Sequence, residues 1–354
     1  MARFVALGVV MVAGLLPGRL PAYDFYPPGV TSSAGAVRWK ATAFPLRFRI
    51  LDTGAFPDYA GLNAETWREI VLRGVSAWVE VETADISIVV EHGTLVGVGA
   101  DIDDGIHTIG FEAREEWLDN RASALVVWRG RDLTECDVLL DPAIFDGWPE
   151  NDPDVAEWAA FFLEELVMHE MGHCLGLRHV PANPVWLGQD ANMPDWPSGF
   201  LPEPLAGLSS DPQMSIAASY GVPRLTPDDR IGVSLLYPAP GFVEERGSIG
   251  GRLLTPEGEP AAFLYVQSVD HASGTAVFGP GVFADELGQF LLEGLPAGPV
   301  HLWVRPTRLY MERPGYQNAR SWDLLDEHRW LSVRPGVAAV LPDITLRAGR
   351  GPPP

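Results

Sequence analysis

Residues 152–179 constrain the fold more than any other segment of the chain. Asp152 stands before Pro153, an order that suits a helix N-cap followed by the first helical residue. Apolar residues then recur at helical spacing as far as about Leu175, and Gly176 follows, where a glycine can take the left-handed conformation that ends a helix. The pattern predicts one long helix that stops abruptly at Gly176.

The last turns of this predicted helix carry residues typical of a zinc site. His169 and His173 are four residues apart and therefore share one helix face, so both imidazoles can reach one metal ion. The chain that turns back at Gly176 brings His179 as a third ligand and leaves a fourth position open. Glu170 beside the site can act as a general base toward water.

A short His-Glu-x-x-His string can also arise by coincidence, with both histidines merely solvated. The composition of 37 glycines and 8 histidines gives odds of about 1 in 400 for a glycine at 176 together with a histidine at 179. The longer motif therefore favours a catalytic zinc site with Zn²⁺ as the cofactor.

The surrounding pattern indicates an α+β layered domain. A helix is expected at 63–79 behind an Asn63 cap, and a second one begins after Thr226 and ends near 237. Alternation and apolar runs predict strands at 44–51, 86–90, 105–111, 124–128 and 136–140.

The composition changes after residue 238. Residues 239–247 are rich in Pro, Gly and Glu, which is typical of a linker, and short strand-like runs separated by turn residues follow. Strands are expected at 248–254, 262–269, 275–278, 289–292, 300–304, 330–333 and 340–346, which together predict an all-β sandwich over 248–347 and a tail at 348–354.

The amino-terminal residues have the layout of a secretory signal peptide. Arg3 precedes an apolar run that ends near Leu16, and a small residue follows at Ala22. We expect a signal at 1–22, an irregular leader at 23–36, and a secreted, extracellular or cell-surface protein without stable membrane insertion after cleavage. The formal net charge of −22 argues against nucleic acid as a partner.

The chain has two cysteines, Cys136 and Cys174. In an oxidising compartment an even number of cysteines favours a disulfide, and Cys174 is rotated away from His173 on the helix. Two buried free thiols remain the alternative.

The zinc motif resembles that of the metzincin metalloproteases, and its surroundings resemble the matrixin branch. Trp39, the strand Glu135-Cys136-Asp137-Val138 and the segment 225–237 carry the second likeness, which spans 37–238. The resemblance implies a metzincin domain with a twisted mixed sheet and long helices. It also implies a methionine turn at Met214, as an apolar floor under the histidines; an ordinary core methionine is the alternative.

The region 248–347 resembles carboxypeptidase regulatory-like sandwich domains, through 247–252 and the glycine turns of 285–298. Such domains are accessory, so a stabilising, spacing or binding role is implied.

Two departures from the better-known matrixins stand out. No cysteine precedes Cys136, so latency through a propeptide cysteine is not expected. The histidine set of the secondary zinc site is also missing. Asp101, Asp103 and Asp104 form either a Ca²⁺-binding loop or a solvated acidic turn.

These features predict a secreted zinc endopeptidase that acts on protein or peptide substrates. An inactive or non-peptidase metzincin-like protein, acting as an extracellular binding module, is the alternative. Substrate preference, oligomeric state and the role of the insert at 180–210 stay open.

Overall fold

The computed structural model describes residues 26, 35–52, 62–96, 100–101, 103–113, 122–146, 153–178, 214, 224–262, 264–270, 277–305 and 327–348. The predicted signal peptide, Asp152, His179, the insert at 180–210 and the end of the tail lie outside these residues.

The first half of the chain forms a five-stranded sheet with the order β2-β1-β3-β5-β4. The strands are β1 (Leu46–Asp52), β2 (Ile88–Val96), β3 (His107–Phe111), β4 (Ala122–Arg129) and β5 (Asp132–Leu140). The four strands β2, β1, β3 and β5 run parallel, whereas β4 pairs antiparallel with β5. The protein is therefore of the α+β class, as predicted, with a mixed sheet.

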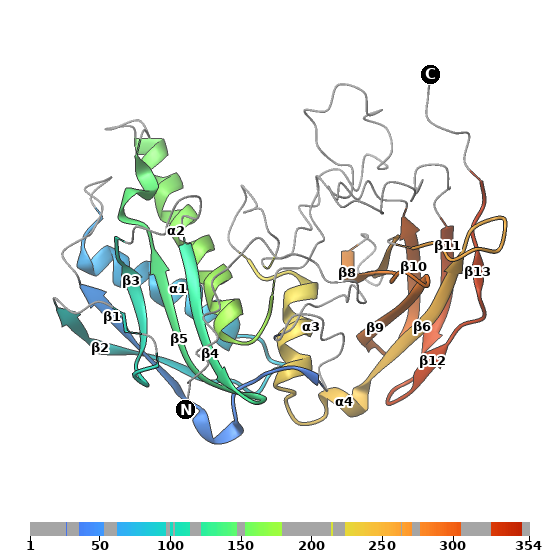
Figure 1. The fold of residues 1–354 in the computed structure, drawn as a ribbon, viewed down its shortest axis with the longest axis horizontal. Helices are drawn as coiled ribbons and strands as arrows, with labels where there is room; N and C mark the ends of the chain where they lie inside the picture. Colours follow the sequence, from blue (N-terminus) through green and yellow to red (C-terminus); the bar gives the residue numbers. More distant parts are fainter. Residues whose placement is uncertain are drawn as a thin grey trace, which may run out of the picture.

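Two long helices, α1 (Ala64–Val79) and α2 (Pro153–Cys174), lie on one face of this sheet (Figure 1). Asn63 caps α1 as predicted, because its side chain accepts from the N–H groups of Glu65 and Thr66. The helices approach closely at Gly74, where a Cβ would lie 2.8 Å from the side chain of Val167. Two short 3-10 helices, Ala41–Ala43 and Pro142–Phe145, flank β1 and β5.

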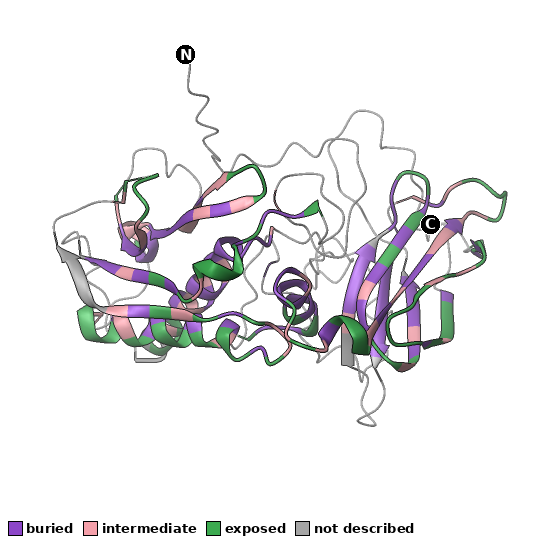
Figure 2. Ribbon diagram, turned by 90° about the horizontal axis from the view of Figure 1, so that it is seen from below, coloured by how far each residue is buried: buried purple, intermediate pink, exposed green. Residues whose placement is uncertain are grey.

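Helix α3 (Pro227–Leu236) begins at the predicted cap, Thr226, whose hydroxyl accepts from the N–H of Asp229 while the Asp229 carboxylate accepts from the N–H of Thr226. It lies between the mixed sheet and the second half of the chain, and most of its residues are buried (Figure 2). The predicted linker at 239–247 contains a short helix, α4 (Phe242–Glu245), which the sequence did not indicate.

The described residues between 246 and 345, called the second half or the β-strand half below, form strands and no helix. One four-stranded sheet has the antiparallel order β11-β10-β7-β8, and the other has β6 at its centre, paired with β9, β12 and β13. The bounds are β6 (Arg246–Leu254), β7 (Tyr265–Asp270), β8 (Val277–Phe283), β9 (Gln289–Pro296), β10 (Gly298–Arg305), β11 (Glu327–Val333), β12 (Ala338–Val340) and β13 (Ile344–Thr345).

The two sheets share a core. Val266 and Leu302 from one sheet, and Ile249, Leu253 and Leu292 from the other, are each at most 1% exposed. Alternating strand positions therefore supply the apolar side chains that fill the space between the two sheets.

Within the described residues, no helix is both long and apolar enough to span a bilayer.

Candidate metal centre

The end of α2 adopts the helix stop that the sequence predicts. Gly176 has φ 97°, its N–H donates to the carbonyl of His173, and the N–H of Leu177 donates to the carbonyl of Gly172. These are the two hydrogen bonds of a Schellman motif, which fixes the chain direction just after the last helical turn. The motif also places the carbonyl of Leu177 beside His173.

His169 and His173 lie together on α2, with ring centroids 4.9 Å apart and planes at 85°. The Nδ1 atom of His173 is 2.9 Å from the carbonyl oxygen of Leu177. Because a carbonyl oxygen can only accept, Nδ1 carries the proton and Nε2 keeps its lone pair. A histidine oriented in this way is prepared to bind a metal through Nε2.

Glu170 lies on the side of α2 that faces the sheet and is 6% exposed. Burial raises the pKa of its carboxyl group to about 8, and a hydrogen bond from the N–H of Ala124 on β4 opposes that rise. A carboxyl group with a pKa in this range can both accept and release a proton near neutral pH.

Met214 packs against α2 at Gly172, which lies between His169 and His173 in the sequence. It is 1% exposed, and a Cβ at Gly172 would overlap its sulfur atom and lie 2.9 Å from the ring of Trp78. The N–H of Met214 donates to Asp229 over 3.1 Å. Only a glycine at 172 allows this approach, so the helix and Met214 are fitted to each other.

Three contacts hold the carboxyl end of α2, and a fourth joins two of the residues that make them. Cys174 forms a disulfide with Cys136 of β5. Of the two alternatives that the sequence left open, a disulfide or two free thiols, the disulfide is therefore confirmed. The indole N–H of Trp39 donates to the carbonyl of Cys174 over 2.7 Å, and the hydroxyl of Tyr237 donates to the carbonyl of Leu175 over 2.8 Å. The same hydroxyl accepts from the N–H of Trp39.

Sequence reasoning missed Tyr26, which lies in the predicted irregular leader. Its N–H donates to the carbonyl of Gly176, and its ring lies edge-on to His173 with centroids 6.4 Å apart. The guanidinium of Arg178 lies 5.9 Å above the same ring. No residue spacing signals such a contact, because 147 positions separate Tyr26 from His173.

The structure therefore places His169, Glu170, His173 and Gly176 at the end of α2 and Met214 against Gly172 of the same helix, whereas His179 lies outside the described residues. Among the described residues, no group of three or more His, Cys, Asp or Glu side chains is placed to hold a metal. The donor chemistry of His169 and His173 fits zinc, with His179 as the predicted third ligand.

The acidic turn at 101–105 is held by internal contacts. Asp103 pairs with Arg129 over 2.7 Å, and Asp104 accepts from the N–H of Ile106. The N–H groups of Asp103 and Gly105 donate to the carboxylate of Glu135. Such contacts are typical of a solvated acidic turn. Binding of Ca²⁺ by this turn stays a prediction.

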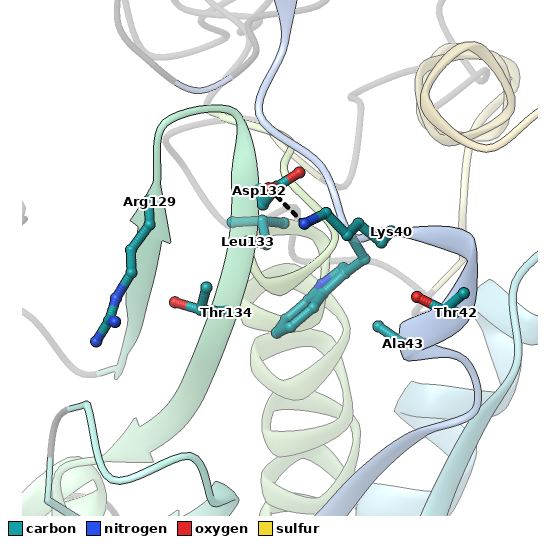
Figure 3. A pocket seen from close by; sticks show the side chains of 8 residues that line it. Lys40, Thr42, Ala43, Arg129, Asp132, Leu133 and Thr134 are labelled. Atoms are coloured by element: carbon teal, nitrogen blue, oxygen red, sulfur yellow. Dashed lines mark ion pairs between the residues drawn. The ribbon is translucent and has the colours of Figure 1, made fainter.

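A cavity of about 430 Å³ lies elsewhere, between the segment after Trp39 and the β4–β5 hairpin (Figure 3). Lys40 forms an ion pair with Asp132 at its edge over 2.8 Å, and Arg129 and Thr134 line it from the hairpin. Its lining contains none of the histidines or carboxylates of the candidate site, so this cavity is separate from the metal centre.

No protein-family model and no curated protein matches this chain. Among solved structures, the Bacillus anthracis TIE protein has 15% identity over 29% of this chain and 17% of its own, with a TM-score of 0.21. (S)-allantoin synthase has 12% identity over 34% and 50%, and a minor pilin of Streptococcus agalactiae has 13% over 32% and 48%, both with a TM-score of 0.22. The chain thus spans at most half the length of these structures, and likenesses this low carry no argument about function.

Proposed function

We propose that this protein is a secreted zinc-dependent endopeptidase whose first half has the metzincin fold. The observation that carries the proposal is the arrangement on α2: two histidines on one face, one of them with its Nδ1–H bonded to a carbonyl, and a buried glutamate between them. The disulfide supports export to an oxidising compartment.

His169, His173 and His179 would hold the zinc ion, which when bound supplies Lewis acidity toward a water molecule and a peptide carbonyl. Glu170 accepts a proton from the attacking water as the new C–O bond forms. It then delivers that proton to the amide nitrogen as the C–N bond breaks, so that an acid and an amine leave. The carboxyl group ends in its starting state.

The test is a Glu170→Gln variant with Glu164→Gln as the matched control. Glu164 lies on the same helix and pairs with Arg73 away from the histidines. We expect Glu170→Gln to keep one zinc per chain and to cleave denatured casein or gelatin about 10² to 10⁴ times more slowly. The control should cleave like the wild type.

Undiminished cleavage by Glu170→Gln would contradict the role of the base. Cleavage that survives removal of zinc by a chelator would contradict the metal assignment. A panel of peptide, ester and polysaccharide substrates, each with and without the chelator, separates an endopeptidase from a metal-dependent hydrolase of another class and from an inactive binding module.

A further inference from the structure

Helix α3 has two contact faces that point to different halves of the molecule. One face contacts β8 and β9 of the β-strand half (Figure 1). The start of the helix contacts Met214 through Asp229. The residues that make these contacts are consecutive, or nearly so, along one short helix. A displacement of α3 therefore alters both contacts at once.

Asp228 makes the polar contact with the second half. It is 5% exposed, and its Oδ1 accepts from the N–H of Gly281 on β8 over 3.1 Å. A backbone N–H buried at such a junction needs an acceptor, because leaving it unpaired is unfavourable. The Asp228 carboxyl supplies that acceptor from 53 residues away.

Ile231 makes the apolar contact one turn later on the same face. It lies against Gly294, which has φ 70°, and a Cβ at Gly294 would overlap the Cγ2 atom of Ile231. Phe242 of α4 closes the other side of this position, 3.5 Å from the same hypothetical Cβ. The notch at Gly294 is therefore shaped for the isoleucine side chain.

Asp229 faces the other way, toward the metal centre. It is 2% exposed, and its Oδ1 accepts from the N–H of Met214 while its Oδ2 accepts from the N–H and hydroxyl of Thr226. Met214 in turn fills the space that Gly172 leaves on α2. A continuous chain of contacts thus joins β8 to the helix that carries His169 and His173.

We propose that the β-strand half positions Met214 beneath α2 through α3, with Asp228 and Ile231 as the positioning residues. The role of Met214 as the floor of a zinc site rests on the proposed function. The positioning of Met214 by α3 does not. The second half would then be a structural part of the candidate site and not an independent appendage.

The test is hydrogen–deuterium exchange on chelator-treated protein, read for the peptides that contain Met214 and residues 277–283. We expect Asp228→Ala to speed exchange about tenfold in both peptides, because the N–H of Gly281 loses its acceptor. Asp228→Asn keeps an acceptor oxygen and should restore slow exchange in both. Ile231→Ala opens the same contact by another route and should reproduce the pattern if Asp228→Ala fails to fold.

The matched control is Asp285→Ala. Asp285 is also a buried aspartate of the second half, and its carboxylate accepts from the N–H groups of Leu287 and Gln289 in its own turn. It should leave the Met214 peptide unchanged. Unchanged exchange at Met214 in both Asp228→Ala and Ile231→Ala would overturn the proposal. Because the protein carries no zinc in this experiment, the result is independent of whether it is a peptidase.

Discussion

Asp137 is a carboxyl group buried in the middle of β5, where only 1% of it is exposed. The N–H and hydroxyl of Thr108 donate to its Oδ1 over 2.9 and 2.6 Å. Within the described part of the chain, its Oδ2 has no hydrogen-bond partner. Burial therefore raises the pKa of this carboxyl group to about 7, although the bonds from Thr108 oppose the rise and the nearby Glu135 adds to it.

This raised pKa predicts a loss of stability as the pH rises. The ordinary value is 3.8, so the folded state holds the proton more tightly than the unfolded state. The contribution of Asp137 to the free energy of unfolding is fully present below about pH 4 and is lost as the pH rises through about 7. The total loss is at most about 4 kcal/mol. Urea unfolding of chelator-treated protein between pH 4 and 8 measures it.

Asp137→Asn is the matched variant, because it keeps the oxygen that accepts from Thr108 and cannot ionise. Relative to the wild type, its free energy of unfolding should rise as the pH increases from 4 to 8. Parallel pH profiles of the two proteins would contradict the raised pKa. Other buried acids, such as Asp228, contribute equally to both profiles and cancel in the difference.

At the scale of the element, the ends of helices could be predicted and the ends of strands could not. Asn63, Thr226 and Gly176 act on backbone groups a few residues away, so the sequence alone locates the ends of α1, α2 and α3. Strand ends depend on a partner elsewhere in the chain. The strand predicted at 86–90 is β2, which continues to Val96 because β1 pairs with it that far.

The disulfide between Cys136 and Cys174 ties β5 to the end of α2, and we expect it to stabilise the fold. It closes a loop with a sequence separation of 38, for which the chain-entropy relation gives about 4 kcal/mol. A Cys136→Ala/Cys174→Ala variant should therefore unfold at a lower urea concentration. Reductant should shift the wild type in the same direction and leave the double variant unmoved; a shift of the double variant would assign the effect to something other than the bridge.

At the scale of the whole molecule, the candidate site was predictable where one helix carries it. His169, Glu170 and His173 lie together because the helical repeat places them so, and Met214 was found through a family resemblance. The bond from Ala124 to Glu170, the contact of Tyr26 with His173 and the sheet order β2-β1-β3-β5-β4 all join distant segments. No local pattern encodes them.

The contacts of α3 predict that a chain ending at Pro238 is less stable than the full chain. Without the second half, Ile231 is exposed to water, which should lower the free energy of unfolding by about 2 kcal/mol. Thermal unfolding of both lengths measures this difference. Ile231→Gln should destabilise the full chain but be nearly neutral in the short one; an equal loss in both would contradict the contact.

The notch at Gly294 and the N–H of Gly281 also bear on how such a chain could have arisen by recombination. A first half joined to another sandwich would need a glycine opposite Ile231 and an unpaired backbone N–H opposite Asp228, as this chain supplies at Gly294 and Gly281. The two halves are therefore not interchangeable modules. Substitutions at 228, 231, 281 and 294 should therefore be inherited together, although the linker between the halves is short.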